Sequence, residues 1–184
     1  VAAASLSDLD DDTLHSARIF LGDTLAVGIG GKCNPAAERV LAAMLANGGT
    51  GDIGCLGHPG ISMPPQQAAV VNGFQIHCLE WDALHEPSVV IALCTSVAAL
   101  SCEVPRRECS VGELLLAFVV GIETAVFFGS AAATAPRFFR PSAAGVMGAA
   151  MAVGKLRGYD PSQLLDLLGL AYSQAGGTMQ AHWE

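Results

Sequence analysis

The segment PSAAGVMGAAMAVGKLRG, residues 141–158, decides the fold class of this chain. It begins with Pro141, which suits the first turn of a helix, and it ends at Gly158 after two basic residues, as helices commonly do. Its small residues recur at three- and four-residue spacing and share one helix face: Gly145, Gly148, Ala149 and Ala152. Another helix can approach such a face closely, so we expect a tightly packed helix. A phosphate-binding loop is the alternative for these glycines, but no predicted strand precedes them.

Helix start signals divide the rest of the chain. Asn34 stands before a proline, Ser110 and Glu113 form a capping box, and Asp160 stands before another proline. The seven expected helices span residues 10–28, 35–48, 65–86, 88–102, 110–134, 141–158 and 160–180. The stretch 48–60 contains six glycines and is expected to be a loop. Because no stretch alternates convincingly as a strand does, we predict a single all-α helical bundle over residues 1–184.

The composition favours small-molecule chemistry over nucleic-acid binding. The chain is 52% apolar and 14% charged, with a net charge of −8 and only nine Lys and Arg residues. Phosphate backbones require clustered basic residues, so no nucleic-acid partner is expected. A chain this apolar hides surface against another subunit or further sequence, and we expect a homodimer. The last residues, AHWE (181–184), follow a helical pattern without a stop signal, so we expect the domain to be incomplete at its C-terminus.

The six cysteines and the long apolar stretches fit a cytoplasmic protein without a membrane partner. No two cysteines form a C-x-x-C pair, so free thiols in a reducing cytosol are the simplest interpretation. The N-terminus lacks the basic region of a signal peptide. Residues 114–136 are long enough to span a membrane, but several neighbouring segments are equally apolar. We therefore expect a buried bundle helix there.

The stretch HCLEWDALHEPSVV, residues 77–90, concentrates charge in an otherwise apolar chain. Five ionisable side chains fall within ten residues: His77, Glu80, Asp82, His85 and Glu86. If the helix that begins near Pro65 continues through them, Asp82, His85 and Glu86 share a face. A metal site is one interpretation, although no second group of ligands completes it. Proton transfer between carboxylate and imidazole is another, and a solvated helix end is the third.

A second candidate feature is the start of the helix at residue 141. Arg137 and Arg140 stand just before Pro141 and Ser142. A helix N-terminus offers free N–H groups to anions, and a guanidinium can bind a carboxylate with two hydrogen bonds. Arg140 and Ser142 are therefore candidate substrate-binding residues, although Arg140 could equally be an ordinary surface residue. Together with the charged cluster they would suit a small polycarboxylate, but no sequence feature shows that the two regions meet.

Three segments together resemble the MmgE/PrpD family: FLGDTLAVGIGG (20–31), VVNGFQIHCLEWDALHEPSVV (70–90) and GAAMAVGKLRGYDPSQLLDLLGLAYSQAGGTMQ (148–180). The resemblance covers residues 17–184 and implies the N-terminal part of the family's helical domain, without the smaller lid domain that follows it. It also implies an enzyme that acts next to a carboxylate of a di- or tricarboxylic acid, without metal or organic cofactor. The methylcitrate dehydratases of the family point to propionate metabolism.

The resemblance transfers candidate roles residue by residue. The common family motif reads L-D-F-D-D-T followed by His, and the chain departs from it at several positions. Glu80 and Asp82 stand at the first two acids, Ala83 and Leu84 replace the third acid and the Thr, and His85 matches the His. Elsewhere, Ile91-Ala92 stand where many relatives carry His-Pro, and Arg140 replaces the His of F-H-P with Pro141 retained. The catalytic lysine of the family is expected beyond residue 184.

These observations predict a lyase-type enzyme, a dehydratase or decarboxylase, with Asp82, His85 and Glu80 as catalytic residues. The expected mechanism removes a proton next to a carboxylate, after which water or carbon dioxide leaves. An epimerase of the same family is the first alternative, because it would return the proton to the opposite face. A non-catalytic helical scaffold is the second, and Ala83, Leu84 and Ile91 favour it because they lack the groups that the family uses.

Overall fold

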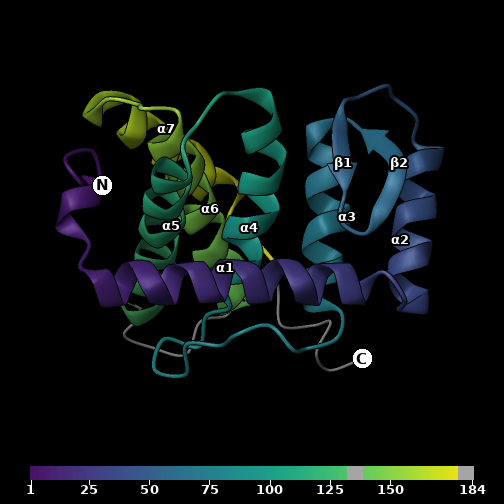
Figure 1. Ribbon diagram of the computed structural model, residues 1–184, viewed down its shortest axis with the longest axis horizontal. Helices are drawn as coiled ribbons and strands as arrows, with labels where there is room; N and C mark the ends of the chain where they lie inside the picture. The colour runs from purple at the N-terminus through teal and green to yellow at the C-terminus, as the bar shows by residue number, and fades with distance from the viewer. Residues whose placement is uncertain (132–138, 178–184) are drawn as a thin grey trace.

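The computed structural model describes residues 1–131 and 139–177 and is mainly helical over them (Figure 1). Its seven α-helices are α1 (Asp11–Gly31), α2 (Pro35–Ala46), α3 (Pro65–His77), α4 (Ala92–Glu103), α5 (Val111–Ala131), α6 (Arg140–Leu156) and α7 (Pro161–Gln174). Two single turns of 3-10 helix, η1 (Leu6–Asp8) and η2 (Val104–Arg106), complete the helical part. The prediction of an all-α domain is confirmed. Arg137 and the far ends of two expected helices lie outside the described residues.

The predicted caps form as expected. Asp10 and Asn34 accept hydrogen bonds from the first turns of α1 and α2. Ser110 and Glu113 bond each other's backbone N–H at the start of α5, with N–O distances of 3.2 and 2.7 Å. Asp160 forms the corresponding capping box before α7. These side chains satisfy backbone donors that a helix end leaves without partners, which is why their sequence pattern located the boundaries.

Helices α4, α5 and α6 form the central bundle, and α1 runs across it at a steep angle (Figure 1). Small residues permit the closest contact, between α5 and α6. A Cβ added at Gly148 would lie 2.5 Å from the carbonyl oxygen of Gly121. Leu115, Phe118 and Leu100 are almost completely buried in the adjacent core. The small-residue face of 141–158 therefore acts as predicted.

Helix α5 has the length and mean hydropathy of a membrane span, as the core helices of soluble proteins often do. It is the one such helix among the described residues. Leu115, Ala117 and Phe118 face the central core, whereas Val111 and Phe127 are exposed.

Two predictions about the middle of the chain are wrong. The segment 48–60, expected to be a loop, contains part of an antiparallel hairpin of β1 (Ile53–Cys55) and β2 (His58–Met63). The buried amides of Asn72 and Gln75 on α3 hold its turn. Asn72 Oδ1 accepts from Leu56 N at 2.9 Å, and Gln75 Nε2 donates to Leu56 O at 2.8 Å.

The second error concerns the helix that was expected to continue to residue 86. Helix α3 ends at His77, and residues 78–91 are irregular. Glu80 has a positive φ of 52°, which breaks the helix, and its acidic side chain would be unfavourable at the negative end of the helix dipole. His85 and Val90 then form an isolated antiparallel bridge around Pro87. Asp82, His85 and Glu86 therefore do not share a helix face.

Candidate functional site

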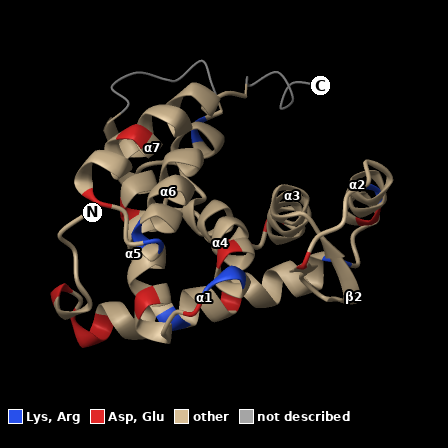
Figure 2. Ribbon diagram, turned by 90° about the horizontal axis from the view of Figure 1, so that it is seen from above, with Lys and Arg blue, Asp and Glu red and all other residues tan. Residues whose placement is uncertain are grey.

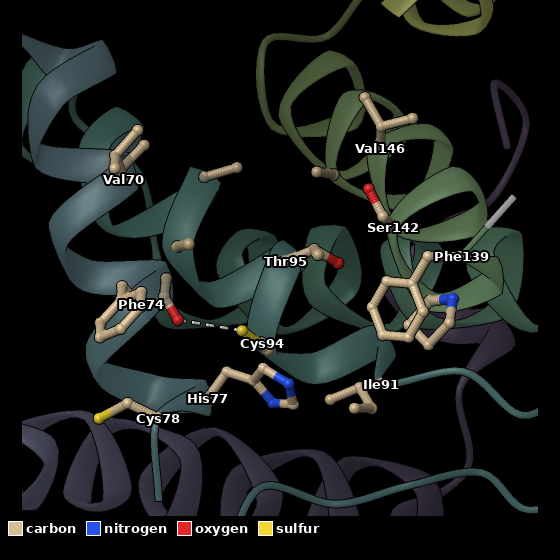
Figure 3. Close-up of a pocket in the computed structure, with 16 residues that line it drawn as sticks. Val70, Phe74, His77, Cys78, Ile91, Cys94, Thr95, Phe139, Ser142 and Val146 are labelled. Atoms are coloured by element: carbon tan, nitrogen blue, oxygen red, sulfur yellow. Dashed lines mark hydrogen bonds between the residues drawn. The ribbon is translucent and has the colours of Figure 1, made fainter. Parts of the chain in front are cut away.

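A cavity of about 560 Å³ opens between α3, α4 and α6 (Figure 3). The helices that surround it contain no Asp, Glu, Lys or Arg except near their ends, where Glu103, Arg140 and Lys155 lie. Figure 2 shows the same distribution, with the charged positions of α4 and α6 at helix ends. Each of the three helices contributes lining residues, among them Val70 and His77 from α3, Thr95 and Ala98 from α4, and Ser142 and Val146 from α6. Cavities of this volume, mostly apolar with a few polar groups, commonly bind small molecules.

His77 and Asp82 form the ionisable pair of the cavity. Nδ1 of His77 lies 3.1 Å from both carboxylate oxygens of Asp82 and donates to them. The Asp82 side chain is only 1% exposed, whereas His77 is 42% exposed. Since Nδ1 is held by the carboxylate, the ring can present Nε2 to the cavity that it lines (Figure 3). This arrangement fixes the orientation of the imidazole and prepares one nitrogen for proton transfer.

The carboxylate also alters the proton affinity of the ring. The hydrogen bond with Asp82 raises the pKa of His77 above its ordinary value of 6.5, and the negative charges of Asp82 and Glu80 act in the same direction. Partial burial opposes this shift but does not cancel it. The imidazolium form therefore persists to a higher pH than in an unpaired histidine, and in that form the side chain can donate a proton.

His85 occupies a separate cluster, contrary to the expectation that it accompanies Asp82. Its Nδ1 lies 2.7 Å from Oγ of Ser88, a fully buried residue. Nη1 of Arg140 donates to the carbonyl oxygen of Ser88 at 3.3 Å. Ser88 thus joins His85 to Arg140, so the charged stretch and the start of α6 do meet in space. Glu80 is exposed and contributes by its charge.

Ser142 places the first turn of α6 at the cavity. It lines the cavity together with Pro141, and its Oγ donates to the carbonyl oxygen of Gly176 at 3.3 Å. Both the hydroxyl and the first-turn backbone N–H groups are donors that suit a carboxylate.

Two cysteines also line the cavity. The Cys94 thiol donates to the carbonyl oxygen of Gly73 at 3.4 Å, and burial, aided by the charge of Asp82, raises the pKa of Cys94 to about 12. Burial likewise raises the pKa of Cys78. Both thiols are protonated near neutral pH and are poor nucleophiles. Across residues 1–131 and 139–177, no three His, Cys, Asp or Glu side chains converge as metal ligands.

The structure therefore pairs Asp82 with His77 and not with His85, the neighbour that the sequence predicted. On a continuous helix His77 and Asp82 would point about 140° apart, because each residue turns by about 100°. Only the end of α3 lets Asp82 fold back onto His77. The sequence did contain a signal for the end of this helix. Glu80 and Asp82 closely follow its apolar part, and acidic residues near a helix C-terminus disfavour continuation of the helix.

The fold and site define a helical domain that presents a histidine–carboxylate pair to an apolar cavity. Comparison with known proteins agrees with this class: residues 1–183 match the sequence model of the MmgE/PrpD N-terminal domain. The chain therefore belongs to the MmgE/PrpD family, as the resemblance implied.

The similar curated proteins are cis-aconitate decarboxylases. The human enzyme is 37% identical over 133 residues, which cover 67% of this chain and 27% of that protein. The mouse enzyme is 29% identical over 180 residues, or 93% of this chain and 36% of that protein. The cis-aconitate decarboxylase-like protein oryM of Aspergillus oryzae is 33% identical over 189 residues, or 97% of this chain and 39% of that protein. The chain thus spans well under half the length of these relatives.

Proposed function

We propose that this domain supplies the proton-transfer and carboxylate-binding groups of a lyase that acts on a small polycarboxylate. The observation that carries the proposal is that His77, which lines the cavity, is hydrogen-bonded to the Asp82 carboxylate. The decarboxylase names of the relatives favour loss of carbon dioxide over loss of water. A cis-aconitate-like substrate is therefore the first candidate.

In the proposed reaction His77 acts as a general acid. Loss of carbon dioxide breaks a carbon–carbon bond and leaves the electron pair on the remaining carbon framework, where a neighbouring double bond and carboxylate delocalise it. The His77 imidazolium then donates its Nε2 proton to a carbon of that framework and becomes neutral. Asp82 holds the ring by its Nδ1–H and stabilises the imidazolium, and solvent restores the proton.

The remaining candidate residues would bind and position the substrate. The Arg140 guanidinium has five N–H donors, of which one on Nη1 is donated to the carbonyl oxygen of Ser88. Its charge and the hydroxyl of Ser142 would bind a substrate carboxylate at the start of α6. His85 would orient Arg140 through Ser88, and Glu80 would add negative charge near His77. A cytoplasmic homodimer remains a prediction from composition.

The test follows cis-aconitate in deuterated water by proton NMR, with the purified protein and its Asp82→Asn variant. We expect a decarboxylated alkene product that carries one deuterium on carbon. Asp82→Asn should lower the rate by about 100-fold or more, because general acid catalysis contributes on that order. The matched control is Asp52→Asn, which changes an exposed acid outside the cavity and should keep the full rate.

Three outcomes are distinguished. Unchanged turnover in Asp82→Asn contradicts the assigned role of the pair. Deuterium uptake without a new alkene product indicates the epimerase. No reaction with any di- or tricarboxylate, in either protein, favours the non-catalytic scaffold.

A further inference from the structure

Thr95 brings a hydroxyl group from α4 to the cavity, in addition to the groups that the proposed reaction uses. The other α4 residues that line the cavity are Cys94, Ala98 and Ala99, which offer a weak thiol donor and methyl groups. Figure 3 shows the hydroxyl oxygen of Thr95 pointing toward the α6 wall, on which Ser142 lies. Thr95 is therefore the strongest hydrogen-bond donor that the side chains of α4 offer to a ligand in the cavity.

The hydroxyl of Thr95 is only weakly engaged by its own helix. It donates to the carbonyl oxygen of Ala92 at 3.3 Å, which is long for a hydroxyl donor. By contrast, Thr24 and Thr124 donate to the carbonyl oxygens four residues earlier in their helices at 2.7 Å. Ser101, which bonds the carbonyl oxygen three residues earlier as Thr95 does, reaches 2.8 Å. The Thr95 hydroxyl therefore loses little when it turns from the backbone to a ligand.

Gly145 on α6 places the Thr95 side chain near Ser142. A Cβ added at Gly145 would lie 2.7 Å from Cγ2 and 3.0 Å from Oγ1 of Thr95, so this side chain contacts α6 at the glycine. Ser142 and Gly145 are three residues apart and are neighbours on one helix face, about 5–6 Å from each other. The Ser142 hydroxyl also makes a long bond, 3.3 Å to the carbonyl oxygen of Gly176. Two weakly engaged hydroxyls thus lie close together at the cavity.

We propose that Thr95 is a further substrate-binding residue, and that its hydroxyl and that of Ser142 donate to one substrate carboxylate. A carboxylate can accept both bonds, because its two oxygens offer about four lone-pair sites. A hydroxyl bond to a charged acceptor is also stronger than the long bonds to backbone carbonyls that it replaces. The inference rests on the proposed function for the presence of a carboxylate. It goes beyond that function by assigning a residue that neither the charge pattern nor the helix start selected.

The test measures binding by isothermal titration calorimetry and so does not depend on turnover. The probe is propane-1,2,3-tricarboxylate, a saturated tricarboxylate without the double bond that the proposed reaction needs. Thr95→Val keeps the size of the side chain and removes the hydroxyl, and it should lower the affinity about tenfold or more. Thr95→Ser keeps the hydroxyl and should retain most of the affinity. Thr124→Val is the matched control, because Thr124 also bonds its own helix but does not line the cavity.

A double-mutant cycle tests whether the two hydroxyls bind the same carboxylate. Ser142→Ala should also lower the affinity about tenfold. The double variant of Thr95→Val and Ser142→Ala should lose clearly less than the product of the two single losses, because a carboxylate that has lost one donor is held less well by the other. Circular dichroism checks that each variant is folded. Threonine and valine have similar helix propensities, so α4 should be retained in Thr95→Val.

Unchanged affinity in folded Thr95→Val would overturn the proposal, and so would an equal loss in Thr95→Ser, because the hydroxyl would then not be the binding group. Single losses that multiply in the double variant would also overturn it, since the two hydroxyls would then act on separate groups. No binding by the unaltered protein would overturn both this inference and the carboxylate site of the proposed function. If cis-aconitate is decarboxylated and Thr95→Val binds normally, the inference alone fails. Binding that depends on Thr95 without any turnover supports the inference while the proposed lyase fails.

Discussion

The Asp82 carboxylate lies within hydrogen-bonding distance of an imidazole and is withdrawn from water. With 1% of its side chain exposed, its charge is screened less by solvent than a surface charge would be. His77 is the partner, and the pair places one ring nitrogen on the carboxylate and leaves the other to the cavity. A histidine in this setting combines fixed orientation with a raised pKa.

The pKa of His77 yields a prediction with a defined sign. Because Asp82 raises it above 6.5, Asp82→Asn should lower it. A proton NMR titration of the imidazole Cε1–H should show a lower midpoint in the variant, with the other histidines unchanged. If His77 donates the proton, the decarboxylation rate should fall as the pH rises through the pKa of His77. In Asp82→Asn the same fall should occur at a lower pH. A midpoint that does not move would contradict the pairing.

At this scale the sequence drew attention to individual side chains but did not show which of them are partners. Asp82, Arg140 and Ser142 were selected from charge pattern and helix-start chemistry, and Ser142 does line the cavity. His77 was noticed in the charged stretch, yet the assumption of a continuous helix directed Asp82 toward His85. Which side chains meet depends on where a helix ends, and that end is set by the backbone at Glu80.

Small residues allow helices α5 and α6 to cross in close contact. Gly121 and Gly148 bring the two backbones together, and a Cβ at Gly121 would lie 2.9 Å from the Ala152 side chain. The atom nearest to a Cβ at Gly148 is the backbone carbonyl oxygen of Gly121, which cannot move aside without shifting a helix. The crossing therefore tolerates no added methyl group, and it also sets the position of the α6 wall of the cavity.

Gly148→Ala should lower the free energy of unfolding by about 1–3 kcal/mol, the usual cost of overpacking a core. Gly169→Ala is the matched control, since its Cβ would meet nothing within 4 Å on the exposed face of α7. That control should raise stability by about 0.5–1 kcal/mol through reduced chain entropy and better helix propensity. Urea denaturation measures both. A neutral or stabilising Gly148→Ala would show that the helices do not cross at this point.

The elements were largely predictable because their caps and periodicity are local signals. The hairpin was not, since β1 has only three residues, too few to show alternation. Its two-residue turn with a positive φ at Gly57 was the available signal. Its stability depends on amides of α3 that are distant in sequence, Asn72 and Gln75. Such long-range contacts cannot be read from a single segment.

At the scale of the whole molecule, the domain keeps charge at its periphery and apolar helices around one cavity (Figure 2). The composition indicated an unusually apolar chain, and the family resemblance anticipated the fold. Neither indicated that the stretch 77–90 and the start of α6 converge, because that depends on how α3, α4 and α6 pack together. Ser88 joins His85 to Arg140, whereas His77 and Ser142 line the cavity.

The central claim is that His77, held by Asp82, transfers the proton, and comparison of His77→Gln with His85→Gln tests it most directly. The measurement is the rate of cis-aconitate decarboxylation at a pH below the pKa of His77. We predict a loss of about 100-fold or more for His77→Gln and a smaller loss for His85→Gln, whose contact is with Ser88. Full activity in His77→Gln, with loss confined to His85→Gln, would contradict the account.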